Sequence, residues 1–192
     1  MKFVIASHNK GKIKEFERIV SPIGIELVTA DLTEAEETGT TFAENAFIKA
    51  DSACKETGLP SIADDSGLCI EYLNGEPGVY SARYAPEGQR KKTVLEKLGG
   101  VPKEKRTAYF EAAICCVFPN GDKIECSGRC YGKITEAPRG DKGFGYDPIF
   151  AVGDKTFAEM SDEEKDKISH RGLALKEFYA KLTEYMKNEV NK

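Results

Sequence analysis

The sequence lacks the features that mark membrane and secreted proteins. No run of its 192 residues approaches the roughly 18 apolar residues of a membrane-spanning helix. The opening apolar run, residues 1–6, is too short for a secretory signal peptide. We therefore expect a cytoplasmic protein with no membrane partner. Repeats, low-complexity tracts and long linkers are also missing, so we expect residues 1–192 to form a single compact domain or two closely joined lobes.

The cysteines lack the spacing of a metal or redox site. None of the six forms a Cys-x-x-Cys pair, and most have apolar neighbours. Reduced thiols in the core are therefore expected in preference to a zinc site or a disulfide framework.

An excess of positive charge is also missing. The formal net charge is −4, whereas proteins that bind nucleic-acid polymers usually carry a basic face, so no such polymer is expected as a partner. The charges are unevenly distributed along the chain. Residues 1–20 carry five Lys or Arg and two Glu, and Asp31, Glu34, Glu36 and Glu37 follow as an acidic stretch. These opposite charges suit an anion held beside a cation.

What the sequence does contain is a succession of strand and helix patterns. Strands are expected at residues 2–7, 25–29 and 59–63, and a pair of long strands at 106–134 joined by Asn120-Gly121. Helices are expected at residues 10–20, from the capping box Thr41-x-x-Glu44 to Gly58, at 89–98, after the capping box Ser161-x-x-Glu164, and from His170 onward. These patterns predict an α/β fold with a mixed, long-stranded sheet flanked by helices.

Two adjacent carboxylates, Asp64 and Asp65, follow the apolar stretch 59–63 and precede Ser66-Gly67. We expect them at a strand end, where the glycine turns the chain and the carboxylates can seat a hard cation such as Mg²⁺. The best second ligand is Glu37, and Asp64 could join Asp65. Solvated turn-forming residues are the alternative interpretation of an isolated Asp-Asp pair.

The turn between the first strand and the first helix carries a second candidate site, Ser7-His8-Asn9-Lys10-Gly11-Lys12. Lysines at a helix start oppose the positive end of the helix dipole, so an anion should offset their charge. Free backbone N–H groups, a glycine and two ammonium groups together suit a phosphate. The P-loop pattern is absent, and a solvated lysine-rich helix start is the alternative.

The same charge pattern recurs at Ser169-His170-Arg171, where Ser169 can cap the last helix. The planar guanidinium of Arg171 suits a phosphate or a purine edge, and His170 can donate or accept a hydrogen bond. Chance placement on the surface is the alternative.

The loop Gly143-Phe144-Gly145-Tyr146-Asp147 is a candidate for base recognition. Glycines on either side of Phe144 allow its ring to protrude and stack on a base, while Tyr146 and Asp147 can hydrogen-bond the base or brace the loop. A Gly/Pro loop anchored by aromatic residues is the alternative.

Together these motifs resemble one family. They are Ser7-x-Asn9-x-x-Lys12-x-x-Glu15, Glu37-Thr38-Gly39, Phe42-x-Glu44-Asn45, Ala63-Asp64-Asp65-Ser66-Gly67-Leu68, Gly75-x-Pro77-Gly78-x-Tyr80-Ser81-Ala82-Arg83, Phe144-Gly145-Tyr146-Asp147-Pro148-Ile149-Phe150 and Ser169-His170-Arg171. In this order they resemble the inosine triphosphate pyrophosphatase family, over residues 1 to beyond 180.

The resemblance implies hydrolysis of ITP, dITP and XTP to the nucleoside monophosphate and pyrophosphate, by a Mg²⁺-dependent homodimer. It also implies a long curved mixed sheet that forms two lobes with a central substrate cleft. Asp65 would be the catalytic base and a metal ligand, and Glu37 the second metal ligand. The implied substrate-binding residues are Ser7, His8, Asn9, Lys10, Gly11, Lys12, Lys49, Ser66, Phe144, Gly145, Tyr146, Asp147, Lys165, His170 and Arg171. His8 departs from the family, which often carries glycine there.

Three other functions are alternatives to this one. A Maf-like pyrophosphatase would act on pyrimidine triphosphates, but Ser169-His170-Arg171 and the Phe144 loop favour a purine. A nucleotide-binding module without catalysis would not need the carboxylates of Glu37, Asp64 and Asp65. A phosphomonoesterase is disfavoured because the Asp-x-Asp spacing of its nucleophile is missing.

Overall fold

The structure is a computed structural model and describes residues 2–190. The chain divides into two compact units, each built from separate stretches of sequence. The first unit comprises residues 1–65, 112–128 and 170–192, and the second comprises residues 66–111 and 129–169. That they act as one two-lobed domain stays a prediction.

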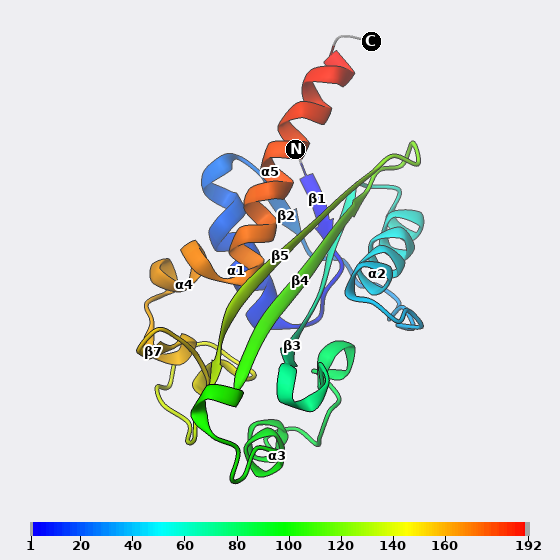
Figure 1. The fold of residues 1–192 in the computed structure, drawn as a ribbon. Coiled ribbons are helices and arrows are strands. Elements are labelled where there is room, and N and C mark those ends of the chain that lie inside the picture. The colour runs from blue at the N-terminus through cyan, green and yellow to red at the C-terminus, as the bar shows by residue number, and fades with distance from the viewer. Residues whose placement is uncertain (1, 191–192) are drawn as a thin grey trace. The chain divides into compact units, whose positions relative to one another are not determined.

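The strands form a mixed sheet. They are β1 (Lys2–Ile5), β2 (Glu26–Val28), β3 (Ser61–Ile70), β4 (Thr107–Val117), β5 (Lys123–Ile134), β6 (Phe150–Val152) and β7 (Lys155–Thr156). Within the described residues the sheet has seven strands in the order β2-β1-β3-β4-β5-β6-β7. β1 pairs in parallel with β2 and β3, whereas β5–β6 and β6–β7 are antiparallel. With helices flanking the sheet, the predicted α/β class with a mixed sheet is confirmed (Figure 1).

Several helices begin at a capping side chain. They are α1 (Lys10–Val20), α2 (Phe42–Thr57), α3 (Arg90–Lys97), α4 (Asp162–Ile168) and α5 (His170–Val190), and short 3₁₀ turns lie at Ser21–Ile23, Glu71–Leu73, Gly78–Tyr80, Lys103–Lys105, Asp147–Ile149 and Phe157–Glu159. Both predicted capping boxes form, Thr41 with Glu44 at α2 and Ser161 with Glu164 at α4. Gly58 ends α2 in the left-handed region at φ 68°, which a residue without Cβ adopts readily.

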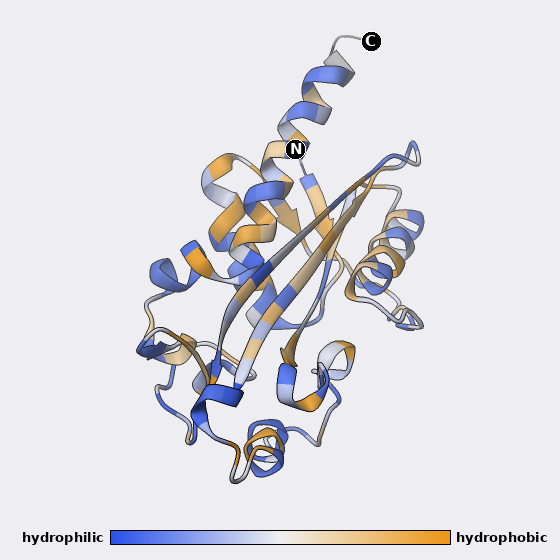
Figure 2. Cartoon of the chain, in the orientation of Figure 1, coloured by the Kyte–Doolittle hydropathy of each residue, from blue (hydrophilic) through white to orange (hydrophobic). Residues whose placement is uncertain are grey.

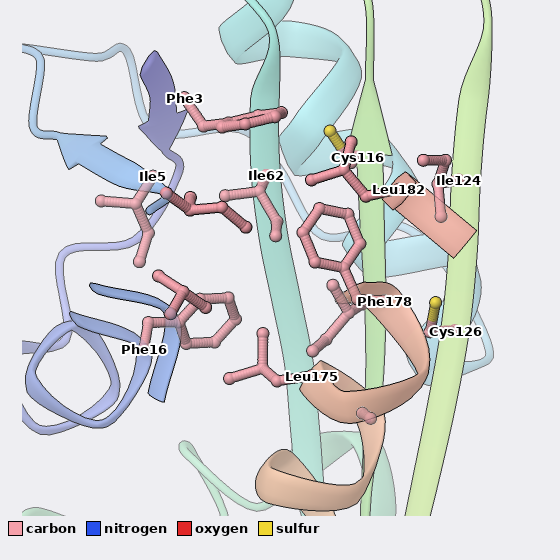
Figure 3. Close-up of a cluster of buried hydrophobic side chains, with 14 of the residues drawn as sticks. Phe3, Ile5, Phe16, Ile62, Cys116, Ile124, Cys126, Leu175, Phe178 and Leu182 are labelled. Atoms are coloured by element: carbon pink, nitrogen blue, oxygen red, sulfur yellow. The ribbon is translucent and has the colours of Figure 1, made fainter. Parts of the chain in front are cut away.

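The first unit buries a core between its strands and the helices α1 and α5. Figure 3 shows Phe3 and Ile5 of β1, Ile62 of β3, and Leu175 and Phe178 of α5 converging in one cluster. α2 covers the other face of the sheet, where Ala46, Ala50 and Ala53 are buried (Figure 1). Figure 2 shows hydrophobic and hydrophilic residues side by side along these helices, as expected for helices with one buried face.

The strands β4 and β5 are adjacent in the sheet and joined by the predicted Asn120-Gly121 turn. The Phe118 N–H donates to the Asp122 carbonyl over 2.9 Å, and Gly121 takes φ 90°. Along β5 buried and more exposed residues alternate through to Ile134, and Gly128, one of the buried positions, packs against the start of α5. A Cβ on Gly128 would lie 2.3 Å from the His170 carbonyl oxygen, so the helix approaches the strand at backbone distance.

The prediction that Asp64 and Asp65 end a strand is wrong. β3 continues through Ser66 and Gly67 to Ile70. Gly67 does not adopt a positive φ, and Leu68 and Ile70 after it are fully buried. The strand continues because most of the residues before and after Gly67 are buried. The two carboxylates therefore lie in the middle of a strand.

The second unit has its own core around the end of β3, the start of β4 and the end of β5. Leu68 and Ile70 pack there with Phe110, Phe150 and Phe157, and the last two rings meet edge to face at 5.0 Å between centroids. Arg106 is also buried, and its guanidinium donates to the carbonyl oxygens of Val101, Leu98 and Thr135. Its charge is thus solvated by backbone.

Some aromatic side chains on α2 and α5 are exposed. Phe47 is 36% exposed and lies under the Lys123 ammonium, 5.0 Å from ring centroid to nitrogen, and Tyr179 is 43% exposed. All six cysteines are free and buried. Within residues 2–190 no helix combines the length and the apolar character needed to cross a membrane.

Candidate active site

Asp64 and Asp65 point to opposite faces of β3, because successive side chains of a strand alternate. Asp64 shares its face with Ile62 and lies among charged side chains of α1 and α5. Asp65 shares its face with Ala63 and lies against α2. The two carboxylates therefore have separate surroundings.

The Asp64 carboxylate forms the centre of a buried charge network. Arg171 donates to Oδ2 from Nη2 over 3.0 Å and from Nε over 3.3 Å, and the Lys12 Nζ lies 2.7 Å from Oδ1. Arg171 also forms a hydrogen-bonded ion pair with Glu15. Arg171 is 1% exposed, Asp64 3% and Glu15 5%. The network thereby links α1, β3 and α5.

The charges in this network hold Asp64 ionised. Burial alone would raise the pKa of Asp64, but Arg171 and Lys12 outweigh it and hold the pKa well below its usual range. Burial lowers the pKa of Lys12, although Asp64 opposes that shift. Asp64 is thus the anion that offsets the positive charge at the start of α1. The sequence predicted a phosphate in that role, and the structure provides an internal carboxylate.

The Asp65 carboxylate accepts hydrogen bonds from two side chains of α2. The Asn45 Nδ2 donates to Oδ2 over 3.1 Å, and the Lys49 Nζ donates to Oδ1 over 3.3 Å. Lys49 also donates to Glu37 Oε1 over 2.8 Å. Burial raises the pKa of Asp65, and Glu37 and Asp64 add to the rise, while Lys49 and Lys12 oppose it. For Lys49, burial would lower the pKa, but Asp65, Asp64 and Glu37 together raise it.

The donor set around Lys49 fits a divalent cation. One ammonium bridges Glu37 and Asp65, so the two carboxylates are close enough to share a cation. Mg²⁺ typically uses one or two carboxylates, with water and phosphate oxygens completing its shell. Among residues 2–190 no cluster of three or more His, Cys, Asp or Glu side chains could hold a metal ion. Asp64 faces the other side of β3 and does not join this pair.

The Ser7–Lys12 turn is tied to its own side chains. The Asn9 Oδ1 caps α1 and accepts from the N–H groups of Gly11 and Lys12 over 2.9 and 3.1 Å, and the Asn9 N–H donates to Ser7 Oγ. The expectation that these amides are free is therefore wrong for Gly11 and Lys12. His8, Asn9 and Lys10 are exposed, Ser7, Gly11 and Lys12 half-buried. Their binding of a triphosphate stays a prediction.

The structure places His170 and Arg171 in the first turn of α5, as predicted, but both are buried. The planar guanidinium of Arg171 is used within the protein, on Asp64 and Glu15. The predicted contacts of His170 and Arg171 with substrate stay predictions.

In the second unit, the structure brings together three predicted residues of the base-recognition loop and α4. The Lys165 Nζ donates to Asp147 Oδ2 over 2.7 Å, and both side chains are about 95% buried. Asp147 Oδ2 also accepts from the Phe144 N–H over 2.8 Å, and the Lys165 ammonium lies 5.0 Å from the Phe144 ring centroid. Asp147 thus braces the loop, one of the two roles left open by the sequence.

The remaining predicted residues of the second unit lie near this group in the sequence or on β3. Tyr146 is buried, and its hydroxyl donates to the Ser81 carbonyl over 2.9 Å. Gly145 is exposed, with φ 59°, and Ser66 is half-buried on β3. Their contacts with substrate stay predictions.

Two residues of the site were missed by the sequence analysis. Glu15 appeared only as part of a motif, and Asn45 was assigned no role. A signal existed for Asn45, because it lies four residues before Lys49 and such a pair shares one helix face. For Glu15 the signal was a carboxylate on the otherwise apolar side of an amphipathic helix.

Comparisons with known proteins give the chain its family. The Ham1 family model matches residues 3–181. A dITP/XTP pyrophosphatase from Bacillus licheniformis is 50% identical over 189 residues, which cover 93% of this chain and 96% of that protein. A dITP/XTP pyrophosphatase from Bacillus subtilis is 48% identical over 191 residues, covering 94% and 96%.

Solved structures agree with these sequence relatives. A HAM1 protein from Coxiella burnetii superposes with a TM-score of 0.86 at 42% identity, covering 96% of this chain and 99% of that one. The Staphylococcus aureus Ham1 protein gives 0.84 at 40% identity, covering 96% and 100%. The resemblance found in the sequence motifs is thereby confirmed. Because the family model spans most of the chain and its relatives share up to half of their residues with it, the chain belongs to the Ham1 family.

Proposed function

We propose that this protein hydrolyses the non-canonical purine nucleoside triphosphates ITP, dITP and XTP to the nucleoside monophosphate and pyrophosphate, with Mg²⁺ as cofactor. Its relatives in Bacillus licheniformis and Bacillus subtilis are dITP/XTP pyrophosphatases, aligned over more than nine-tenths of this chain. The observation that carries the proposal is the pair Glu37 and Asp65, bridged by one ammonium on the α2 face of β3. Such a pair suits a cation bound to polyphosphate.

Asp65 is the proposed general base. Its raised pKa brings a carboxylate closer to the operating pH, which strengthens a base that must accept a proton from water. The water oxygen attacks the α-phosphorus, the bond from that phosphorus to the bridging oxygen breaks, and pyrophosphate leaves. The proton of the water passes to Asp65. A bound Mg²⁺ would neutralise charge on the phosphates and on the leaving group.

Glu37 and Asp65 are the residues that would hold the metal ion, with phosphate and water oxygens as the other ligands. The Lys49 ammonium, which bridges the two carboxylates in this structure, would then be available for a phosphate oxygen. Lys12 lies near the start of α1, where its ammonium is held 2.7 Å from Asp64 Oδ1. The substrate thus meets two lysines whose positions are set by carboxylates.

Preference for a 6-oxo purine is proposed to follow from hydrogen-bond donors that the purine O6 satisfies. Adenine presents an amino group at that position and would leave such donors unpaired, which discriminates strongly in a buried site. The candidates for this contact are the residues assigned to the base by resemblance: Phe144, Gly145, Tyr146, Asp147, Lys165, His170 and Arg171. A homodimer in the cytoplasm is part of the same proposal.

Product analysis is the direct test. The purified protein is incubated with ITP and Mg²⁺, and the products are separated by chromatography. IMP and pyrophosphate in equal amounts are expected, and EDTA should stop the reaction. Orthophosphate in place of pyrophosphate would overturn the proposed bond cleavage.

A panel of triphosphates tests the substrate class. ITP, dITP and XTP should turn over with higher kcat/KM than ATP, dTTP and UTP. Efficient turnover of dTTP and UTP without ITP would favour the Maf-like alternative, and binding without turnover of any of them would favour a non-catalytic module.

A further inference from the structure

Asn45 is fully buried in the first unit although its side chain is polar. Its exposed fraction is 0%, and its amide makes two hydrogen bonds. The Nδ2 group donates to Asp65 Oδ2 over 3.1 Å, and Oδ1 accepts from the Gly39 N–H over 2.8 Å. A single side chain therefore connects the proposed base to the loop before α2.

The chemistry of the two partners fixes the orientation of the Asn45 amide. The Gly39 N–H can only donate, so it requires the amide oxygen, and an ionised Asp65 carboxylate can only accept, so it requires the NH₂ group. A flipped amide would lose both hydrogen bonds inside the protein, where an unsatisfied polar group is unfavourable. Asn45 thus holds both partners in one defined arrangement.

The loop at Gly39 lies directly against the start of α2. A Cβ on Gly39 would lie 2.6 Å from Asn45 Oδ1 and 2.7 Å from the Glu44 Cβ. The Gly39 backbone therefore packs directly against these two side chains, with no room for a side chain of its own. Glu37 stands two residues earlier in the same loop, and its Oε1 meets the Lys49 Nζ that also contacts Asp65. The position of Glu37 relative to Asp65 therefore depends on where the loop is held.

We propose that Asn45 is a positioning residue that sets the separation of the Glu37 and Asp65 carboxylates, so that they can share one divalent cation. This inference rests on the proposed function, because that function gives the two carboxylates their role. By donating to Oδ2, Asn45 directs the other oxygen of Asp65 toward the shared cation position, which Lys49 occupies in this structure. By accepting from Gly39, it fixes the loop that carries Glu37.

The test uses Asn45→Ala in the full-length protein, with three measurements. Hydrogen exchange followed by mass spectrometry should speed up in the segment 37–41, because the Gly39 N–H loses its acceptor. Binding of Mn²⁺ without nucleotide, followed by the electron paramagnetic resonance signal of the free ion, should weaken by about 10- to 100-fold, the usual range for losing a group that orients a metal ligand. The kcat for ITP should fall by a similar factor.

Glu44→Ala is the matched control. Glu44 accepts from the N–H groups of Thr40 and Thr41 and completes the capping box, but it does not contact Asp65. This variant loosens the same helix start and the same 37–41 segment, so its thermal stability should drop and exchange there should speed up, while Mn²⁺ affinity and kcat should fall much less than in Asn45→Ala because the contact with Asp65 remains. Equal losses in both variants would mean that Asn45 acts only through the stability of α2, and the proposal would be wrong.

Asn45→Asp tests the two hydrogen bonds of Asn45 separately. It also provides a test if Asn45→Ala does not fold. It keeps an acceptor for Gly39 but places an oxygen, in place of a donor, against Asp65. Exchange at 37–41 should stay near wild type while kcat falls at least tenfold. Wild-type kcat in Asn45→Asp would overturn the role toward Asp65, and the proposed hydrolysis by the wild type would be unaffected. Should the wild type itself fail to hydrolyse ITP, the exchange and Mn²⁺ measurements still decide the role of Asn45.

Discussion

The two faces of β3 give adjacent aspartates opposite electrostatic surroundings. On the face of α1 and α5, Asp64 meets Arg171 and Lys12, which hold its pKa well below the usual range. On the face of α2, burial raises the pKa of Asp65, and Lys49, which opposes the rise, is shared with Glu37. Strand alternation alone separates them. Two identical adjacent residues therefore have pKa values shifted in opposite directions, down for Asp64 and up for Asp65.

The largest expected difference between the two faces is in catalysis. Asp65→Asn keeps the shape of the side chain but removes the proposed base and a metal ligand. We expect kcat for ITP to fall by about 10²–10⁴-fold, the usual contribution of a general base. Pyrophosphate release measures the rate, and circular dichroism should report an unchanged fold. A variant that keeps wild-type kcat would contradict the role of Asp65.

The next largest effect is expected on stability, at the Asp64 face. Arg171→Ala leaves the carboxylates of Asp64 and Glu15 buried without their guanidinium. Removing one member of a buried ion pair typically lowers the free energy of unfolding by about 3–5 kcal/mol, which urea denaturation can measure.

Arg129→Ala is the control for Arg171→Ala. Arg129 pairs with Glu111 at 2.9 Å, but half of its side chain is exposed, and exposed pairs contribute about 0–1 kcal/mol. Similar losses in the two variants would mean that burial of Arg171 has no energetic consequence. The KM for ITP in Arg171→Ala also tests its predicted contact with substrate.

A smaller effect is expected in the acid dependence of stability. The folded pKa of Asp64 lies below its unfolded value of about 3.9, so its contribution is complete above that value and is lost as the pH falls toward the folded pKa. The free energy of unfolding of wild type should therefore fall more steeply from about pH 5 to pH 3 than that of Asp64→Asn. Urea denaturation across this range measures both slopes, and equal slopes would contradict the lowered pKa.

The smallest effect is expected at Asp65 and has the opposite sign. Its folded pKa is raised, so the ionised form lowers stability above the folded pKa and has no such effect below the unfolded value of about 3.9. Asp65→Asn should gain stability relative to wild type as the pH rises from about 4 to 7. If Asp65→Asn instead lost stability relative to wild type over that interval, the pKa of Asp65 would be lowered like that of Asp64, and the two faces of β3 would not differ.

Much of the fold was predictable because local signals and burial agree. The Asn120-Gly121 turn and the capping boxes at Thr41 and Ser161 depend on neighbouring residues and were predicted correctly. The end of β3 was not, because Gly67 reads locally as a turn, while the actual extended conformation depends on burial by distant parts of the chain.

Several charged residues of the site could be identified from the sequence, but the residues that they contact could not. Sequence patterns identified Lys12, Asp64, Asp65 and Arg171 as unusual charges. That Asp64, with Glu15, would satisfy Arg171 could not be predicted, because these residues meet across more than 100 positions of sequence. Contacts of this range are set by how helices dock on the sheet, which periodicity does not encode.

The close approach of α5 to β5 has a consequence for sequence variation. Where backbone touches backbone at Gly128, even a single methyl group would push the first turn of the helix outward and carry Arg171 with it. Position 128 is far from the aspartates along the chain and has no side chain to contribute. We therefore expect alanine at position 128 to disturb the ion pairs of Arg171 with Asp64 and Glu15, because the helix that carries Arg171 would have to move.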